Sequence, residues 1–161
     1  MYLAKDVALR FVAKGIAENN PVTQMQLQKL VFFAHGVHLA NEKGPLIKER
    51  FEAWQFGPVI PALYDVYKLY GSSKITDLSL LSHSLRSAIA PVESLQITAA
   101  AQEAIDVTWD TLKGIDAIRL SNWTHLENSP WHKTFVQGAN KIIPNEIIKD
   151  YFAQNILEAK A

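Results

Sequence analysis

The sequence predicts a mainly α-helical protein, a single compact domain over residues 1–161, built on a central helix at about 23–41 and carrying a small β element of two or three strands. Apolar residues recur at spacings of three and four along most of the chain, which is the pattern of helices with one buried face. Ser, Thr or Asp precedes several of these segments at the position of a helix cap. The stretch 46–56, in contrast, alternates in the way typical of a strand.

The composition supports one folded domain and limits its chemistry. A chain of 161 residues, 48% of them hydrophobic and four of them Trp, can build a substantial core. The absence of Cys excludes disulfides, thiolate metal sites and a Cys nucleophile. The 16 basic and 16 acidic residues balance, which disfavours a dedicated nucleic-acid-binding protein.

The sequence has no feature of export or membrane insertion. The N-terminus passes directly into a charged helical pattern without an apolar signal segment. No apolar run has the length of a membrane span. We therefore expect a cytoplasmic protein without a membrane partner.

The first two helices have the clearest signals. Residues 3–17 place apolar side chains on one face, and Pro21 follows the end of that helix. Thr23 with Gln26 three positions later is a capping box, in which both side chains bond backbone N–H groups at the start of a helix. This second helix is apolar over most of its circumference, so we expect it at the centre of the domain.

A strand and a third helix follow, separated by a Gly-Pro turn. Residues 46–56 have no purely polar side, which favours an extended segment covered on both faces. Gly57 and Pro58 end it. Pro61 suits the first turn of a helix, where its fixed backbone angle fits and its missing N–H is not needed, and the helix is expected over 61–70.

The rest of the chain is expected to be helical with irregular connections. Residues 72–97 are the least regular part, with a short helix favoured at 78–85 and Pro91 before an extended stretch. Residues 138–143 favour a turn and a strand. Four further helices are predicted after Thr98, Asp116, Ser129-Pro130 and Pro144, ending near Gly114, His125, Val136 and beyond Ile156.

Histidines raise the question of an enzyme. His125, Glu127 and His132 could serve a metal-dependent hydrolase, because two imidazoles and a carboxylate form a minimal zinc ligand set. Their spacing matches no metal motif and crosses a predicted helix end, so packing or capping is the favoured role. His35 and His38 are likewise expected to be hydrogen-bonded core residues.

No pattern of a catalytic nucleophile or a phosphate loop is present. The chain lacks a Gly-x-Ser-x-Gly turn, and its seven glycines are scattered. We therefore expect no enzymatic activity, no metal and no cofactor.

Aromatic residues are the remaining candidates for function. Most are expected in the core, because large aromatic side chains supply the burial that a domain of this size needs. Any that stay exposed would anchor a protein partner, since Trp and Tyr dominate interface hot spots. Phe56, Tyr67 and Trp123 are our candidate partner-binding residues.

Two N-terminal motifs and a downstream signature occur together in this chain. They are Leu27-Gln28-Lys29-Leu30-Val31-Phe32-Phe33-Ala34, then Glu52-Ala53-Trp54-Gln55-Phe56-Gly57-Pro58-Val59-Ile60-Pro61 with Leu63-Tyr64, and later Leu120-Ser121, Thr124-His125 and Pro130-Trp131. In order and spacing this set resembles the Panacea domain, the SocA-like or GepA-like family of phage-associated antitoxin proteins. The resemblance covers most of the chain. It suggests a mainly structural role for Leu27, Gln28, Lys29, Leu30, Glu52, Trp54, Gly57, Pro58, Tyr64, His125, Pro130 and Trp131.

The resemblance implies an antitoxin-like protein of phage or prophage origin that neutralises a cognate toxin by direct binding. It leaves open a protease adaptor, which would need a cytoplasmic protease as a further partner, and a prophage accessory protein. It implies no catalytic residue and does not identify the toxin. A role in transcription is disfavoured by the neutral charge and by the lack of a recognisable recognition helix.

Two charges are embedded in the apolar motifs. Lys29 and Glu52 would each be costly to bury alone. We therefore expect these side chains to pair with each other or to be satisfied by backbone groups.

Overall fold

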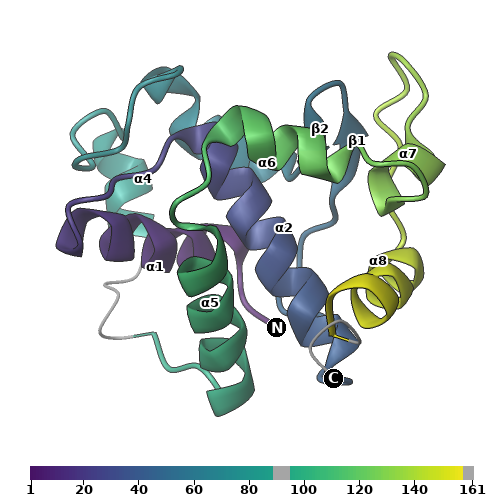
Figure 1. Cartoon of the computed structure of the whole chain (residues 1–161). Helices are drawn as coiled ribbons and strands as arrows, with labels where there is room; N and C mark the ends of the chain where they lie inside the picture. The colour runs from purple at the N-terminus through teal and green to yellow at the C-terminus, as the bar shows by residue number, and fades with distance from the viewer. Residues whose placement is uncertain (89–94, 158–161) are drawn as a thin grey trace.

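The computed structural model describes residues 1–88 and 95–157 (Figure 1). Pro91, predicted to bound an extended stretch, lies outside these ranges. The helices and strands follow one another as α1 (Ala4–Ala17), α2 (Gln24–Ala40), β1 (Glu52–Trp54), β2 (Gly57–Val59), α3 (Pro61–Tyr67), the 3-10 turn η1 (Lys68–Tyr70), α4 (His83–Ala88), α5 (Ala99–Leu112), α6 (Ala117–Thr124), α7 (Pro130–Thr134), α8 (Asn145–Phe152) and the π-helical turn η3 (Ala153–Leu157).

Helix α2 is the centre of the molecule, as predicted. Helices α1, α5, α6 and α8 pack around it, and every residue from Leu27 to Ala40 is buried (Figure 1). The predicted capping box is formed, since Gln26 N donates to Thr23 Oγ1 over 3.2 Å and Thr23 N donates to Gln26 Oε1 over 2.8 Å. The mainly α-helical fold class is confirmed.

Aromatic side chains tie α2 to the segments on either side of it. The Phe32 ring meets Phe51 edge-on at a centroid distance of 5.0 Å and Phe152 of α8 at 5.7 Å. Such edge-to-face pairs add to the stability that burial alone provides. The segment before the hairpin and helix α8 therefore share one core with the central helix.

The β element is a two-stranded antiparallel hairpin. Trp54 pairs with Gly57 across the turn, and β1 is bordered on its other side by a single bridge from Glu52 to Ile142. The strand expected over 46–56 is thus shorter than predicted. Ile47 instead forms an isolated parallel bridge with Tyr2, so the chain changes direction before the hairpin begins.

Four predicted helices differ from the structure in their boundaries. The helix predicted after Pro144 to include Ile156 is α8, which ends at Phe152, followed by the π-helical turn η3. The helix expected over 61–70 is α3 followed by the tighter turn η1, and the helix expected to reach about Val136 ends at Thr134. The short helix expected at 78–85 begins later, at His83. Its start is set by the hydroxyl of Ser82, which accepts a hydrogen bond from Leu85 N over 3.2 Å.

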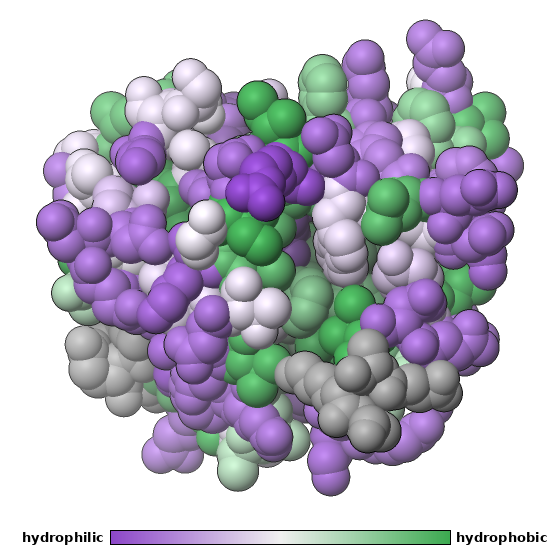
Figure 2. All heavy atoms as spheres, in the orientation of Figure 1, coloured by the Kyte–Doolittle hydropathy of each residue, from purple (hydrophilic) through white to green (hydrophobic). Residues whose placement is uncertain are grey.

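The face of the molecule drawn in Figure 2 has no single dominant property. Figure 2 shows hydrophobic residues scattered among hydrophilic ones on one face of the molecule. None of the helices in the described ranges combines the length and hydropathy that crossing a bilayer requires.

Candidate functional site

The turn of the β1–β2 hairpin is anchored by side chains from α2, α6, α7 and the residue that ends α6. Four backbone carbonyl groups, those of residues 54, 55, 56 and 58, each accept a hydrogen bond from one of these side chains. In order, the donors are Trp131 Nε1 (2.5 Å), His125 Nε2 (2.9 Å), Ser121 Oγ (2.7 Å) and Lys29 Nζ (3.0 Å). These hydrogen bonds hold the backbone of the turn, which defines where its side chains emerge before any partner arrives.

The outer edge of β2 is closed by two side chains of α2 in place of a third strand. The Gln28 amide forms two hydrogen bonds with the backbone of Ile60, accepting from its N–H over 2.9 Å and donating to its carbonyl over 3.2 Å. Lys29 covers the carbonyl of Pro58, whose nitrogen has no proton to donate. The Gln-Lys pair of the first motif therefore satisfies an edge that would otherwise attract another strand.

Gly57 is required by the close approach of the hairpin to α2 and α6. Its φ of +114° lies in a region that favours glycine, and a Cβ added there would lie 2.6 Å from Thr124 Oγ1 and 2.9 Å from Lys29 Cε. These contacts explain the glycine of the second motif.

Lys29 is a buried cation. Its side chain is only 2% exposed, and burial lowers the pKa of its ammonium group from 10.5 to about 7. The described contacts give the ammonium one hydrogen-bond acceptor, Pro58 O. Because a lysine ammonium has three N–H donors, two of them remain for other acceptors.

The expected pairing of Lys29 with Glu52 is wrong, and the alternative of a backbone partner is right for Lys29. Glu52 is half-buried, and its Oε1 accepts from the indole N–H of Trp54 over 3.1 Å. Side chains two apart on a strand point to the same face, which brings Glu52 and Trp54 together. Lys29 instead donates to the backbone carbonyl of Pro58 in β2.

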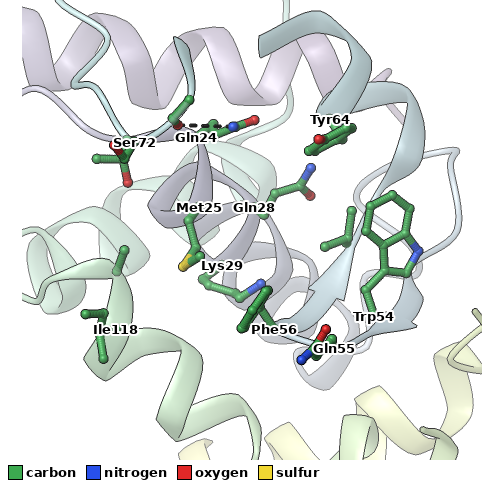
Figure 3. A pocket seen from close by; sticks show the side chains of 14 residues that line it. Gln24, Met25, Gln28, Lys29, Trp54, Gln55, Phe56, Tyr64, Ser72 and Ile118 are labelled. Atoms are coloured by element: carbon green, nitrogen blue, oxygen red, sulfur yellow. Dashed lines mark hydrogen bonds between the residues drawn. The ribbon is translucent and has the colours of Figure 1, made fainter. Parts of the chain in front are cut away.

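An apolar groove of about 580 Å³ lies beside the hairpin. In Figure 3 its side chains surround the opening, with Ile118 of α6 at one side, Trp54 at the other and Lys29 extending from α2 toward the hairpin. Large apolar side chains at the groove remain open to solvent, since Phe56 is 59% and Ile118 71% exposed. Exposed apolar clusters of this kind mark interaction sites on protein surfaces.

Comparison with known proteins identifies the family. Residues 27–132 match the family described as "Antitoxin SocA-like, Panacea domain". This chain belongs to that family. Antitoxin SocA of Caulobacter vibrioides (strain NA1000 / CB15N) is 30% identical to the chain over 131 residues, which cover 80% of this chain and 68% of the relative. No solved structure is significantly similar to this chain.

The range matched to the Panacea family includes every side chain that anchors the hairpin turn. Lys29 lies near its beginning and Trp131 near its end. These motif residues are far apart in the sequence, and the structure brings them together at one turn. Pro130 starts α7 and so positions Trp131, while Leu27 and Leu30 fill the core beneath.

The three candidate partner-binding residues of this Panacea chain have different environments. Phe56 is exposed at the groove. Tyr67 is 1% exposed, so its assignment to partner binding is wrong: with Leu63 and Tyr70 it forms the inner face of α3 and η1, whereas Tyr64 faces outward and is 40% exposed. Residues at spacings of three and four share one face of a helix, and the aromatic pattern alone does not say which face is buried.

Trp123 lies away from the groove. It is half-buried and packs against Phe33 and Phe152 at centroid distances of 5.6 and 6.0 Å. It lines a second cavity that shares no lining residue with the groove. Sequence reasoning missed Met25 and Ile118, because an apolar residue on a predicted helix is ordinarily assigned to the core.

The histidines have structural partners in the Panacea fold. His125 lies against Trp131 with a centroid distance of 3.8 Å, and its ring nitrogens face the carbonyls of Ser121 and Gln55. His132 Nδ1 accepts from Asn128 N over 3.3 Å, and Glu127 is exposed. In the described ranges no three His, Cys, Asp or Glu side chains converge as metal ligands.

His35 and His38 also contact neighbouring groups of the fold. His35 Nε2 lies 3.0 Å from Asn145 Oδ1, and His38 Nδ1 lies 2.7 Å from Gly44 O. Burial lowers the pKa of His35 to about 4, so its ring is neutral at physiological pH.

Proposed function

We propose that this Panacea protein is an antitoxin that neutralises a cognate toxin by direct binding, in the cytoplasm of a cell carrying it on a phage or prophage. One observation carries the proposal: Phe56 is exposed at the tip of an anchored hairpin, beside an apolar groove. A large apolar side chain on a rigid support loses little conformational freedom on binding, which favours affinity. The curated name of the SocA relative agrees with this role.

The proposed activity depends on contact and not on catalysis. Trp54 and Tyr64 lie against each other at the groove with a centroid distance of 5.5 Å, so they form a continuous aromatic wall next to Phe56. A few residues, among which Trp and Tyr are enriched, supply most of the binding energy at protein interfaces. We place the toxin contact on this surface, made by Met25, Trp54, Phe56, Tyr64 and Ile118.

The proposal is tested by expressing the small open reading frame adjacent to this gene, alone and together with this protein. We expect the small protein to arrest growth, the wild-type antitoxin to restore growth, and the two proteins to co-purify. The variants Phe56→Asp and Ile118→Asp should lose both effects. Leu69→Asp is the matched control, because Leu69 is 72% exposed but does not line the groove.

Three results would contradict the proposal. An adjacent protein that is harmless, or one that remains toxic in the presence of the wild-type protein, would remove the antitoxin function. Rescue that disappears in a protease-deficient host while the complex still forms would replace simple neutralisation with a protease adaptor.

A further inference from the structure

We infer that the groove receives a toxin segment in which apolar side chains flank one carboxylate, and that this carboxylate pairs with the Lys29 ammonium. The inference rests on the proposed function and specifies the chemistry of the partner. It depends on three features of the groove: a buried cation with spare donors, a lining without any acidic group, and apolar walls.

Lys29 is the cation in question. Among the described residues that line the groove, it alone carries a formal charge. Its described hydrogen bond to Pro58 O occupies one of the three ammonium donors. Lys29 lines the groove, and its side chain extends from α2 toward the hairpin (Figure 3).

The protein itself supplies no carboxylate for Lys29. Glu52, the acidic residue of the family motifs, accepts a hydrogen bond from the Trp54 indole. No described ion pair involves Lys29. A buried charge without a counter-ion is unfavourable, and a partner that excludes the remaining water would make it more so. A basic segment is therefore disfavoured in the groove, and an acidic one is favoured.

The walls of the groove determine what flanks the carboxylate. Met25, Phe56 and Ile118 present apolar surface around the position of Lys29. A Met side chain adapts its shape to different apolar partners. An occupant with many charges would leave most of them unpaired against these walls, so one acidic side chain among apolar ones is the complementary pattern.

The depressed pKa of Lys29 supports the same conclusion. In the free protein burial holds this pKa at about 7, so at pH 8 most molecules carry a neutral amine. A carboxylate delivered by the partner favours the charged form. Binding at pH 8 should therefore take up a proton.

The experiment is a double-mutant cycle between this protein and the adjacent-gene toxin, with Kd measured by titration calorimetry. Lys29→Met removes the charge and keeps the length of the side chain, and each Asp and Glu of the toxin is changed to Asn or Gln. We expect Lys29→Met to weaken binding about 10- to 100-fold, and one toxin variant to weaken it similarly. Combining the two should cost no more than either alone.

The control and a wild-type readout separate binding from folding. Lys68→Met removes an exposed cation of η1 that does not line the groove, and it should leave Kd unchanged. If Lys29→Met unfolds, the wild-type protein still tests the inference. Calorimetry of toxin binding at pH 8, in buffers of different ionisation enthalpy, should show proton uptake. The toxin variant that weakens binding should abolish this uptake.

The inference is overturned if folded Lys29→Met binds the toxin with the wild-type Kd. It is also overturned if, for every toxin carboxylate, the fold-change in Kd of the double mutant equals the product of the two single fold-changes, because no carboxylate would then be coupled to Lys29. It is also overturned if the groove is occupied by a second copy of this chain, seen as a dimer that Phe56→Asp dissociates. In each of these cases toxin neutralisation by the wild-type protein would persist, so the antitoxin function would stand, but a dimer across the groove would move the toxin contact to another surface. Failure of the wild-type protein to bind the toxin would remove both.

Discussion

At Gly57 the hairpin backbone comes closer to its neighbours than a side chain would permit. The Thr124 hydroxyl and the Lys29 methylene chain occupy the place of a Cβ, and the φ of +114° adds backbone strain for any other residue. The close approach also brings Lys29 Nζ to Pro58 O. A single missing Cβ thus allows α2, α6 and the hairpin to meet.

Replacing Gly57 by Ala is expected to destabilise the protein by about 2–4 kcal/mol, because both the contacts and the backbone angle oppose it. Urea unfolding measures the change. Gly138→Ala is the control for the backbone angle alone, since Gly138 has a φ of +77° with nothing within 4 Å of its Cβ position. Equal losses in the two variants would contradict the steric part of this account.

Lys29 also makes folding stability depend on pH. Its pKa is 10.5 in the unfolded chain and about 7 in the folded protein, so the unfolded state binds more protons between these values. The penalty for the buried charge is complete below pH 7 and decreases as pH rises. Relative to Lys29→Met, the wild-type free energy of unfolding should therefore increase by about 1.4 kcal/mol per pH unit at most from pH 7 to 9. Urea unfolding curves that shift in parallel for both proteins would contradict this.

At the scale of elements, α2 has two functions in the fold. Its first turns present Gln28 and Lys29 to the edge of β2, and its later turns pack against α8. Gly36 marks the second contact, because a Cβ at this position would overlap the ring of Phe152. The helix therefore gives up intrinsic helical stability at Gly36 to allow close packing.

Gly36→Ala shows whether helix propensity or close packing against α8 has the larger effect on stability. Helix propensity favours Ala over Gly by about 1 kcal/mol, whereas overpacking against a fully buried ring costs about 1–3 kcal/mol. Phe152 is 0% exposed, so we expect packing to prevail and the melting temperature to fall. Gly114→Ala, with nothing within 4 Å of its Cβ position, should not lower it. A higher melting temperature for Gly36→Ala would show that α8 moves at little cost.

Gln28 tests the closure of the β2 edge. Gln28→Leu keeps a similar volume but leaves the N–H of Ile60 without its partner, in a region that is fully buried; the Ile60 carbonyl keeps its hydrogen bonds from Leu63 N and Tyr64 N. An unsatisfied buried group costs about 1–3 kcal/mol, so we expect a loss of that size in urea unfolding. The amide proton of Ile60 should also exchange faster with solvent. Unchanged exchange in the folded variant would mean that the edge is protected by other groups.

At the scale of the whole molecule, the balance of 16 basic and 16 acidic residues leaves little long-range field. Encounter with a partner is then governed by diffusion and by the shape of the groove. The pairing inferred for Lys29 acts only after contact, in a buried position that salt screens weakly.

Association with the toxin should therefore depend weakly on ionic strength. We expect the association rate, measured by stopped-flow fluorescence, to change less than about threefold between 50 and 500 mM NaCl. A decrease of tenfold or more would show that a charged patch steers the encounter, in which case the groove would be only part of the contact surface.

The helical framework could be predicted from the sequence because its signals are local. Thr23, Thr98, Asp116 and Ser129 each accept a backbone hydrogen bond at the helix start predicted for them. Capping and hydrophobic periodicity involve only a few neighbouring residues, so they can be recognised from the sequence alone. Helix α4 starts later than predicted because Ser82 caps it, which the apolar pattern does not indicate.

The chain's own order of residues determined its helices, its central α2 and the motifs of its family, since each depends on neighbours within a few positions. Only the tertiary structure decided that Lys29 bonds Pro58 and not Glu52, that Tyr67 is buried while Phe56 is exposed, and that a groove opens beside the hairpin. These outcomes depend on which faces of distant segments meet. Which faces meet is determined by packing over the whole molecule, and it cannot be predicted from a local sequence pattern.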